Sequence, residues 1–356
     1  MKKWMETCEV LTRLHQVLGA GGAAALATVV RVVGSAYRRE GAKLLVASDG
    51  STFGNVSGGC LEQDVIQVAQ RVLRTDSPEL RTYCSSEDRI EAWNLGLGCD
   101  GRVDVHVAPM RGSLPLARVA LSSLAPVPFV LCTDLEGQAL TVTTEACEGH
   151  LGSPDLTRAV RERAHDLLTH DRGTLEMLHG RSIFFDAFDP PPALVICGAG
   201  EDAPALVRLA ASVGFRVAVV DRRPGRLDAA RFGGAARLIE SDGESLPRLI
   251  DPTRSYAVLM THNFADDVAY LGALVATSIP YIGILGPRER TNRMLEATAS
   301  RAAAALQQQR LYAPVGLDIG ADGAEQVALA IVAEVLAFRS GRQVQSLRER
   351  ALSIHA

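Results

Sequence analysis

Two short loops in the first third of the chain combine glycines with a cysteine, a pairing suited to sulfur chemistry beside an anion. One loop is Ser57-Gly58-Gly59-Cys60, and the other runs from Gly96 to Gly101 and contains Cys99. Glycines let successive backbone amides turn inward as an anion-binding nest. Cys60 lies at or near the expected start of a helix, where the partial positive charge favours the thiolate. Cys60 and Cys99 are therefore candidate catalytic residues, and Cys60 is also the candidate metal ligand.

A basic segment just before the first loop adds side chains that can neutralise an anion. It runs from Gly34 to Lys43 and includes Arg38 and Arg39, and arginine can bind a phosphate through two parallel hydrogen bonds. A structural explanation of the cysteines also stands, because cysteine is a small residue that fills helix starts and compact loops. The residues predicted to contact an anionic cofactor in this part of the chain are Arg38, Ser57, Gly58, Gly59, Cys60 and Glu62.

The second half of the chain contains a glycine pattern typical of nucleotide binding. Gly198, Gly200 and Ala203 form G-x-G-x-x-A between an apolar strand and a helix. In this pattern the first glycine makes a tight turn and the second lets a phosphate approach the helix N-terminus. Asp221 ends the next strand, where an acid would bind a ribose hydroxyl. We therefore predict Gly198, Gly200 and Asp221 as contacts of a nucleotide.

Other residues at the same rim leave the identity of the ligand open. Glu201 and Asp202 repel a phosphate, so Asp202 could instead cap the helix while the crevice holds a different ligand. His262 and Asn263 follow a later strand and face the crevice if the sheet is doubly wound. His262 is a candidate acid–base or structural residue, and Asn263 is a candidate contact that also fits a helix N-cap. Arg288 is the predicted cation for an anionic ligand.

The elements that must hold these residues change character along the chain. Before the run Asp189-Pro190-Pro191-Pro192, short strands, hairpins and helices are mixed. After it, apolar strands alternate with helices, which is typical of a parallel sheet covered on both faces. We predict an α/β protein with an N-terminal mixed α+β domain over residues 1–188. A C-terminal Rossmann-like, doubly wound parallel sheet follows over residues 189–356.

Composition excludes several classes of protein. The 356 residues carry a formal net charge of −4, which argues against a nucleic-acid-coating surface. Val268 to Pro287 has no charge, but its prolines, glycines and change of period predict a buried helix followed by a buried strand rather than a membrane span. The seven cysteines form no CxxC pair, which favours a reduced, cytoplasmic location. The cysteines outside the two glycine loops lie in periodic segments and are predicted core residues.

The ordered motifs resemble those of a known family, the xanthine dehydrogenase accessory family of the XdhC/CoxI type. The resemblance runs over nearly the whole chain and is weakest between Met110 and Pro192. It departs from the usual pattern at Tyr37 and Glu40, where prolines are common, and at Glu201, where many members have histidine. The segments that carry it begin at Gly34, Gly54, Gly96, Gly198, Thr261, Ile282 and Gly316.

The resemblance implies a maturation factor rather than an enzyme. Such proteins bind molybdenum cofactor and work with a cysteine desulfurase that supplies its terminal sulfide. They then insert the cofactor into an apo molybdenum hydroxylase. The resemblance also implies that the protein is a homodimer. The cofactor would be the plain pterin or its cytosine dinucleotide form, and a dinucleotide tail would suit the Gly198 loop. A thiol suits the thiophilic metal or a transferable sulfur.

Two other functions fit parts of the sequence. The glycine pattern and Asp221 suit an NAD(P)-dependent oxidoreductase that uses His262 as its acid–base group. A hydrolase or transferase could instead use Cys60 as nucleophile, with His262 or His106 as base.

Overall fold

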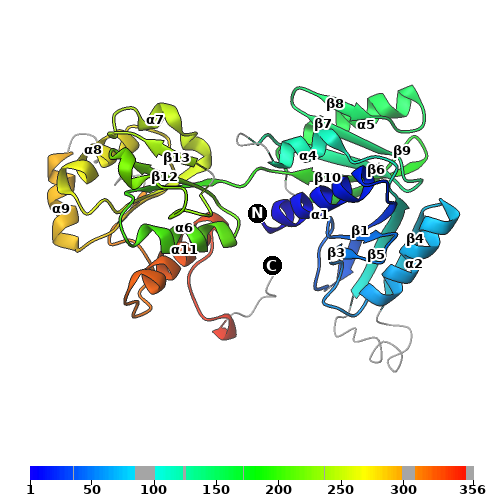
Figure 1. The fold of residues 1–356 in the computed structure, drawn as a ribbon, viewed down its shortest axis with the longest axis horizontal. Helices are drawn as coiled ribbons and strands as arrows, with labels where there is room; N and C mark the ends of the chain where they lie inside the picture. The colour runs from blue at the N-terminus through cyan, green and yellow to red at the C-terminus, as the bar shows by residue number, and fades with distance from the viewer. Residues whose placement is uncertain are drawn as a thin grey trace. The chain divides into compact units, whose positions relative to one another are not determined.

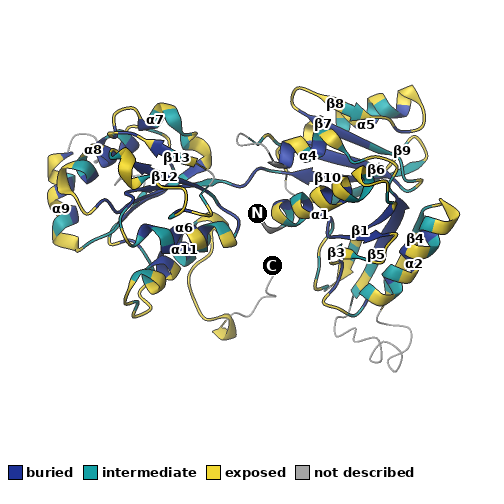
Figure 2. Cartoon of the chain, viewed as in Figure 1, coloured by how far each residue is buried: buried dark blue, intermediate teal, exposed yellow. Residues whose placement is uncertain are grey.

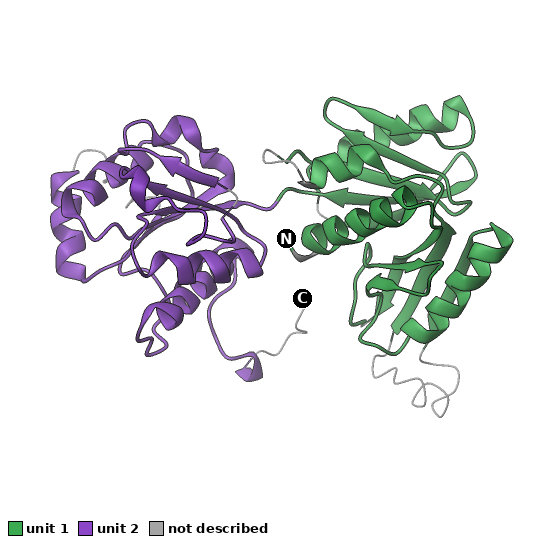
Figure 3. Ribbon diagram, viewed as in Figure 1, with its two compact units in different colours: residues 1–190 green, residues 191–356 purple. Residues whose placement is uncertain are grey.

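The computed structural model describes residues 1–34, 36–84, 101–122, 126–170, 172–235, 237–298 and 309–349. The chain forms two compact units, Met1–Pro190 and Pro191–Ala356, so the division falls within the proline run (Figure 3). Each unit has its own hydrophobic core.

The N-terminal unit contains two five-stranded antiparallel sheets (Figure 1). The first sheet has the order β3-β2-β1-β5-β4, and the second has the order β8-β7-β6-β10-β9. The strands of the first sheet are β1 (Ala24–Gly34), β2 (Lys43–Ala47), β3 (Thr52–Gly54), β4 (Glu79–Cys84) and β5 (Gly101–Pro109). Those of the second are β6 (Phe129–Asp134), β7 (Ala139–Thr143), β8 (Cys147–Gly149), β9 (Gly173–Leu178) and β10 (Arg181–Phe188).

Among the described residues, four helices complete this unit: α1 (Lys2–Gly19), α2 (Glu62–Thr75), α4 (Pro115–Ser122) and α5 (Pro154–Leu167). The apolar stripe of α2 covers one face of the first sheet, and that of α5 covers one face of the second. The other faces of the two sheets, here called the inner faces, share a third core with α1 and α4. Strands β1, β2, β6 and β10 are therefore buried over most of their length on both sides (Figure 2).

The two sheets repeat one topology. In each half a helix precedes three strands, a second helix follows, and two more strands complete the sheet. The strand order is the same in both halves, and every neighbouring pair is antiparallel. The N-terminal unit is thus two copies of the same fold whose inner faces contribute to one core.

The two halves differ at one edge. The connections 35–42, 55–61 and 85–100 of the first half correspond to the shorter connections 135–138, 150–153 and 179–180 of the second. Because neighbouring strands are antiparallel, the ends of β1, β3 and β4 and the starts of β2 and β5 meet at the same edge of the first sheet. All three longer connections of the first half therefore leave from this edge, here called the loop edge.

The C-terminal unit is built on a six-stranded parallel sheet with the order β13-β12-β11-β14-β15-β16. Helices α7, α8 and α9 cover one face, and α6 and α11 pack together on the other (Figure 1). The strand order matches the predicted Rossmann-like fold, with its switch point between β11 and β14. The strands are β11 (Ala193–Cys197), β12 (Arg216–Asp221), β13 (Arg237–Glu240), β14 (Ser255–Leu259), β15 (Ile282–Ile284) and β16 (Leu311–Tyr312). The helices are α6 (Ala203–Ser212), α7 (Leu246–Leu249), α8 (Phe264–Val275), α9 (Arg288–Ala297) and α11 (Ala324–Ser340), with 3-10 turns at Pro224–Arg226, Pro252–Arg254 and Leu347–Glu349.

The charge-free run Val268 to Pro287 forms the end of α8 and strand β15, as predicted. None of the helices within the described ranges has both the length and the apolarity that a bilayer-crossing helix needs. The core prediction for the remaining cysteines is only partly right. Cys132 and Cys197 are buried, whereas Cys84 and Cys147 are exposed, because they lie at the end of an edge strand and the start of another.

Candidate functional site

The glycine–cysteine loop 55–61 at the loop edge is held by its own side chains. The Glu62 carboxylate accepts the amides of Val56 at 3.3 Å and Ser57 at 2.8 Å, and it also bonds the Ser57 hydroxyl. That hydroxyl oxygen accepts the amides of Gly59 and Leu61, each at 3.1 Å. The amides of Val56 and Ser57 therefore already bind an anion of the chain itself, and the amide of Gly59, within the predicted nest, is bonded to the Ser57 hydroxyl.

The charge of Glu62 is stabilised by this arrangement. Partial burial would raise the pKa of Glu62, but the hydrogen bonds from Ser57 and from the amide of Val56 outweigh it and hold the pKa below its usual value. Ser57 and Glu62 thus fix the shape of the loop. Direct contact of either residue with a cofactor stays a prediction.

The thiol of Cys60 remains accessible beside this network. Gly58 and Gly59 are exposed, and Cys60 is partly exposed with its Sγ 3.6 Å from the Ser57 hydroxyl. Cys60 lies just before Leu61, the N-cap residue of α2. The loop is therefore open to solvent at its glycines and its cysteine. Among the residues that the structure describes, no three histidine, cysteine or acidic side chains cluster as a metal site.

Two cations of the basic segment 34–43, Arg38 and Lys43, form ion pairs within the fold, whereas Arg39 is exposed. The Arg38 guanidinium forms a two-point ion pair with Glu6 of α1, and its side chain is only 10% exposed. Glu40, one of the departures from the family pattern, accepts the amide of Val32 at 2.9 Å. At the other departure, the ring of Tyr37 lies over Gly58. The predicted contact of Arg38 with an anion would require that Glu6 release it.

Cys99, the other candidate catalytic cysteine, lies outside the described residues. Its connection, 85–100, leaves β4 and enters β5 at the loop edge. His106, the alternative base for Cys60, lies on the inner face of the first sheet, where it lines a cavity. Cys60 packs against the core between that sheet and α2, which is the opposite face. His106 is therefore excluded as a base for Cys60.

The environment of His106 predicts a pH dependence of stability. Burial lowers the pKa of His106 from 6.5 to about 4, so the unfolded chain binds more protons between these values and stability falls as the pH falls through this window. Acidification from pH 7 to pH 5 should cost about 2 kcal/mol through this group. Urea unfolding at both pH values would measure it, and His106→Gln should lose that part of the dependence. An equal pH dependence in the variant would contradict this assignment.

In the C-terminal unit, Gly198 is required by a close backbone approach. It has φ +120°, and a Cβ there would lie 2.6 Å from the carbonyl oxygen of Met260, at the end of the neighbouring strand β14. A Cβ at Gly200 would meet nothing closer than the His262 ring at 3.4 Å. The first glycine is thus needed by the fold at the switch point, whereas the second leaves space above the loop.

This difference predicts opposite results for two alanine substitutions. Gly198→Ala should lower the free energy of unfolding by about 2–4 kcal/mol, because the new Cβ meets backbone in a disfavoured conformation. Gly200→Ala, the matched control, should change stability little. Thermal or urea unfolding of both variants is the measurement. Equal effects would contradict a structural role specific to Gly198.

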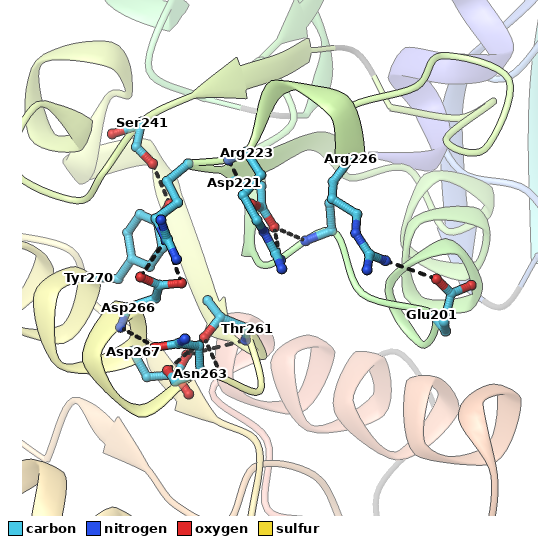
Figure 4. A network of polar contacts seen from close by, with 12 residues as sticks. Glu201, Asp221, Arg223, Arg226, Ser241, Thr261, Asn263, Asp266, Asp267 and Tyr270 are labelled. Carbon is cyan, nitrogen blue, oxygen red and sulfur yellow. Dashed lines mark hydrogen bonds and ion pairs between the residues drawn. The ribbon is translucent and has the colours of Figure 1, made fainter.

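Asp221 is buried and has a full set of partners. Its oxygens accept the amide of Ala199 at 2.9 Å and the amide and guanidinium of Arg223 at 2.8–2.9 Å (Figure 4). Burial would raise the pKa of Asp221, but these bonds outweigh it and lower the pKa to about 2. A ribose hydroxyl could bind this carboxylate only after displacing Arg223. The ribose contact predicted for Asp221 therefore lacks a ready site here. The oxidoreductase alternative, which relies on this contact, is weakened in the same way.

Acidic residues at the glycine loop are likewise paired. Glu201 bonds Arg226 and Arg231, each at 3.1 Å, and the first of these pairs is visible in Figure 4. His262, for which the sequence offers no catalytic partner, lies 3.4 Å from the Asp202 carboxylate. His262 also has φ +58°, a left-handed conformation that is uncommon outside glycine.

The remaining rim residues divide into structural and exposed groups. Asn263 caps α8 by accepting the amide of Asp266 at 3.1 Å. Its side chain therefore has the N-cap role that the sequence offered as the alternative to ligand binding. Thr261 bonds the buried Asp267, which also pairs with Arg290. Arg288 is exposed at the start of α9 and remains a predicted cation for an anionic ligand.

The sequence did not predict an ion pair that is buried on both sides in the N-terminal unit. Asp186 on β10 pairs with Lys3 at 2.7 Å and with Lys43, and both Asp186 and Lys43 are 2–3% exposed. Gly41 has φ +88°, and a Cβ there would lie 2.6 Å from the Asp186 carboxylate. The motif that ends in Gly41-Ala-Lys43 therefore joins the two halves of this unit. The sequence feature that could have indicated this ion pair is the position of Asp186 among the apolar residues of its strand.

Comparison with known proteins gives matches in both units. The model described as "XdhC and CoxI family" matches residues 17–84, and the model described as "XdhC Rossmann domain" matches residues 194–335. A Bacillus subtilis protein named as a probable xanthine dehydrogenase subunit is 33% identical over 92% of this chain and 97% of its own length. The Escherichia coli molybdenum cofactor insertion chaperone PaoD is 24% identical over 93% of this chain and 88% of its own.

A solved structure is similar over both units. The crystal structure of a Bacillus halodurans protein described as a xanthine dehydrogenase covers 95% of this chain and 98% of its own, with 30% identity and a TM-score of 0.73. Together with the 33% identity over almost the full length of the Bacillus subtilis relative, the motifs at the loop edge and the parallel sheet lead to one conclusion: the chain belongs to the XdhC and CoxI family.

Proposed function

We propose that this chain is an accessory protein that binds molybdenum cofactor and inserts it into a molybdenum hydroxylase of the xanthine dehydrogenase or aldehyde oxidase type. One relative is named as a molybdenum cofactor insertion chaperone and another as a probable xanthine dehydrogenase subunit. The observation that carries the proposal is the loop edge. The first half alone has three long connections there, and they contain Cys60 and Cys99.

The duplicated fold supplies an internal comparison for this assignment. The second half builds the same sheet with short turns, so the fold itself does not need the longer loops. Loops on a rigid scaffold are where binding and catalytic residues concentrate. The additional residues of the glycine–cysteine loop 55–61 are therefore assigned to function and the loops of the second half to structure, whereas the connection 35–42 also makes contacts of the fold such as the Arg38–Glu6 ion pair.

The residues at this edge fit the cofactor in a specific way. Glu62 occupies the amides of Val56 and Ser57, so we assign these two amides to loop geometry and leave the exposed glycines 58 and 59 to contact the anion. Cys60 offers a partly exposed sulfur, which suits molybdenum as a ligand. The same thiol could accept the outer sulfur of a persulfide on the cysteine desulfurase, which would leave the desulfurase cysteine as a free thiol. When bound, the cofactor supplies the metal centre and its terminal sulfide. This chain would hold it near Cys60 and keep the loop rigid through the Ser57–Glu62 hydrogen bonds.

The proposal extends to partners. A cysteine desulfurase would supply the sulfur, a homodimer would carry the cofactor in the cytoplasm, and the apo hydroxylase would receive it. The plain pterin and the cytosine dinucleotide form both remain predictions, as does a nucleotide at the Gly198 loop. A tail bound there would have to use groups other than Asp221, or displace Arg223 from it.

The test uses the protein isolated from cells that make the cofactor. Elemental and mass analysis should find molybdenum and the pterin bound to it. The loaded protein should then activate a purified apo hydroxylase, and more strongly when the cysteine desulfurase and cysteine are present during loading. A protein free of molybdenum and pterin that also fails to activate the apoenzyme would refute the proposal.

A further inference from the structure

The inner face of the first sheet carries a charged patch next to the loop edge. It consists of two rows that cross β1, β5 and β4, and residues opposite one another in antiparallel strands share a face. One row is Arg31, Asp104 and Thr82, and the other is Val33, Arg102 and Cys84. Because the rows are two residues apart along each strand, they lie on the same face. These six residues are here called the arginine patch.

A β-bulge turns Arg31 onto this face. The ladder between β1 and β5 is regular up to Val29, and the next pair joins Arg31 to Asp104, so β1 contains one extra residue at this point. Val29 packs in the core beneath α2, and so does Val32 after the bulge. Arg31 therefore lies on the opposite, inner face. Bulges redirect side chains and are frequent beside functional sites.

A buried carboxylate holds the two arginines in place. Asp104 is buried, and its oxygens accept Nε of Arg31 at 2.7 Å and Nε of Arg102 at 3.0 Å. The Thr82 hydroxyl donates to the same carboxylate at 2.8 Å. Burial would raise the pKa of Asp104, but these hydrogen bonds outweigh it and hold the pKa below its usual value. The ionised carboxylate thus fixes both guanidinium groups over the sheet.

The outer nitrogens of both arginines are available to another partner. Each arginine binds Asp104 through Nε, and Nη2 of Arg102 also lies 3.5 Å from the Thr82 hydroxyl. Within the described residues, the two guanidinium groups make no further hydrogen bond or ion pair. The side chains of Arg31 and Arg102 are 49% and 47% exposed. Two guanidinium groups and one carboxylate leave an excess of positive charge that faces solvent.

The second half of the unit has no equivalent patch. The pairs Thr28–His106 and Thr133–Phe184 occupy the same place in the two sheets, because Thr28 and Thr133 stand in the last pairs of the β1–β2 and β6–β7 ladders. Two residues earlier, the first half has Asp104 and the second half has Ser182. The ladder between β6 and β10 is regular, without a bulge. The shared fold therefore does not need the arginine patch.

We propose that the arginine patch docks an acidic segment of a partner protein, with a carboxylate of that segment bridging Arg31 and Arg102. Carboxylates accept parallel hydrogen bonds from guanidinium N–H groups. The two guanidinium groups are already positioned by Asp104, which lowers the entropy that binding costs. This interaction goes beyond the proposed cofactor function and does not depend on Cys60.

The surroundings of the patch favour a peptide over a free anion. Val33 within the patch and Leu80 beside it on β4 are exposed large apolar residues on the same face. They suit the aliphatic side chains of a protein segment, whereas an inorganic anion gains nothing from them. Arg31 and Arg102 also lie outside the lining of the cavity that contains His106, and small molecules prefer such enclosed sites.

The first test is calorimetric titration of the full chain with a capped peptide of four glutamates and one leucine. We expect a Kd below about 1 mM at low ionic strength, and binding at least about tenfold weaker when glutamine replaces each glutamate. The acidic peptide should also slow alkylation of Cys84, within the patch, but not of Cys147, which is exposed in the second half. Absence of binding, equal binding of the glutamine peptide, or equally tight binding of inorganic phosphate would overturn the proposal.

The second test compares three arginine variants that circular dichroism shows to be folded. Arg31→Gln and Arg102→Gln should each weaken binding of the acidic peptide about tenfold, because each removes one guanidinium group while the amide can still donate to Asp104. Arg81→Gln is the matched control, since Arg81 is exposed on the opposite face of β4, and it should alter binding less than about threefold. Equal effects of all three would refute the patch.

Sedimentation of the same variants tests a second copy of this chain as the occupant. The proposal expects the same oligomeric state for wild type, Arg31→Gln and Arg81→Gln. Loss of self-association in Arg31→Gln but not in Arg81→Gln would overturn the assignment to a partner protein.

Discussion

A chain with Cys60 replaced by alanine should fold normally and lose at least about tenfold of its ability to activate an apo molybdenum hydroxylase. Folding should survive because Cys60 lies in an open loop whose hydrogen bonds are made by Ser57 and Glu62. Activation should fail because the substitution removes the soft sulfur ligand from this loop. The measurement is hydroxylase activity after incubation with the loaded variant, together with its molybdenum content.

Two exposed cysteines serve as controls for this experiment. Cys84→Ala and Cys147→Ala remove thiols of similar or greater exposure and should leave activation unchanged. Cys147 lies in the second half, whose loops we assign to structure. Full activation by Cys60→Ala, with a wild-type molybdenum content, would remove Cys60 from the mechanism.

Replacement of Asp186 by asparagine should lower the free energy of unfolding by about 3–5 kcal/mol, because it leaves a buried lysine without its counter-ion. Lys43 is 3% exposed and Asp186 is 2% exposed, so water cannot compensate the lost charge. Urea unfolding followed by circular dichroism measures the effect. Asp155→Asn is a suitable control, since Asp155 pairs with Arg158 at the surface and such pairs contribute little.

The same ion pair predicts a response to acid. Burial would raise the pKa of Asp186, but Lys3 and Lys43 outweigh it and hold the pKa below its usual value. The stabilisation that ionised Asp186 gives is complete above about pH 3.9, the pKa of this carboxyl in the unfolded chain. It is lost as the pH falls through the lower pKa of Asp186 in the folded protein. Wild type and Asp186→Asn should therefore converge in stability at strongly acid pH. A constant difference between them would show that the loss comes from packing rather than from charge.

The C-terminal fold was predictable from sequence because its signals are local. Apolar strands alternate with helices, and Gly198 lies where two neighbouring strands come closest. Turn chemistry at such a position admits few residues. The partners of the polar side chains at the crevice of this unit were less predictable. Nothing local indicates that Arg223 turns back onto Asp221, so the sequence did not predict that an arginine of the chain itself binds this carboxylate.

The N-terminal fold was harder to predict because its organising contacts are distant in sequence. Lys43 and Asp186 are 143 residues apart, and the repeated topology is present in strand order rather than in residue identity. Thr28 and Thr133 occupy equivalent positions, but their neighbours across the sheet differ completely. The sequence indicated the glycine–cysteine loop, but it did not predict that Glu62 accepts the amides of Val56 and Ser57. Glu62 belongs to the motif itself.

Covalent linkage of the two copies has a consequence for what this unit can evolve. A symmetric pair of identical subunits must present the same side chains from both partners, so any change on one inner face appears on the other. Within a single chain each copy accumulates its own substitutions. One sheet could therefore acquire Lys43 and His106 while its counterpart acquired Ala139 and Phe184. Two halves of one topology in a single chain thus allow an asymmetric interior that a homodimer of one half could not build.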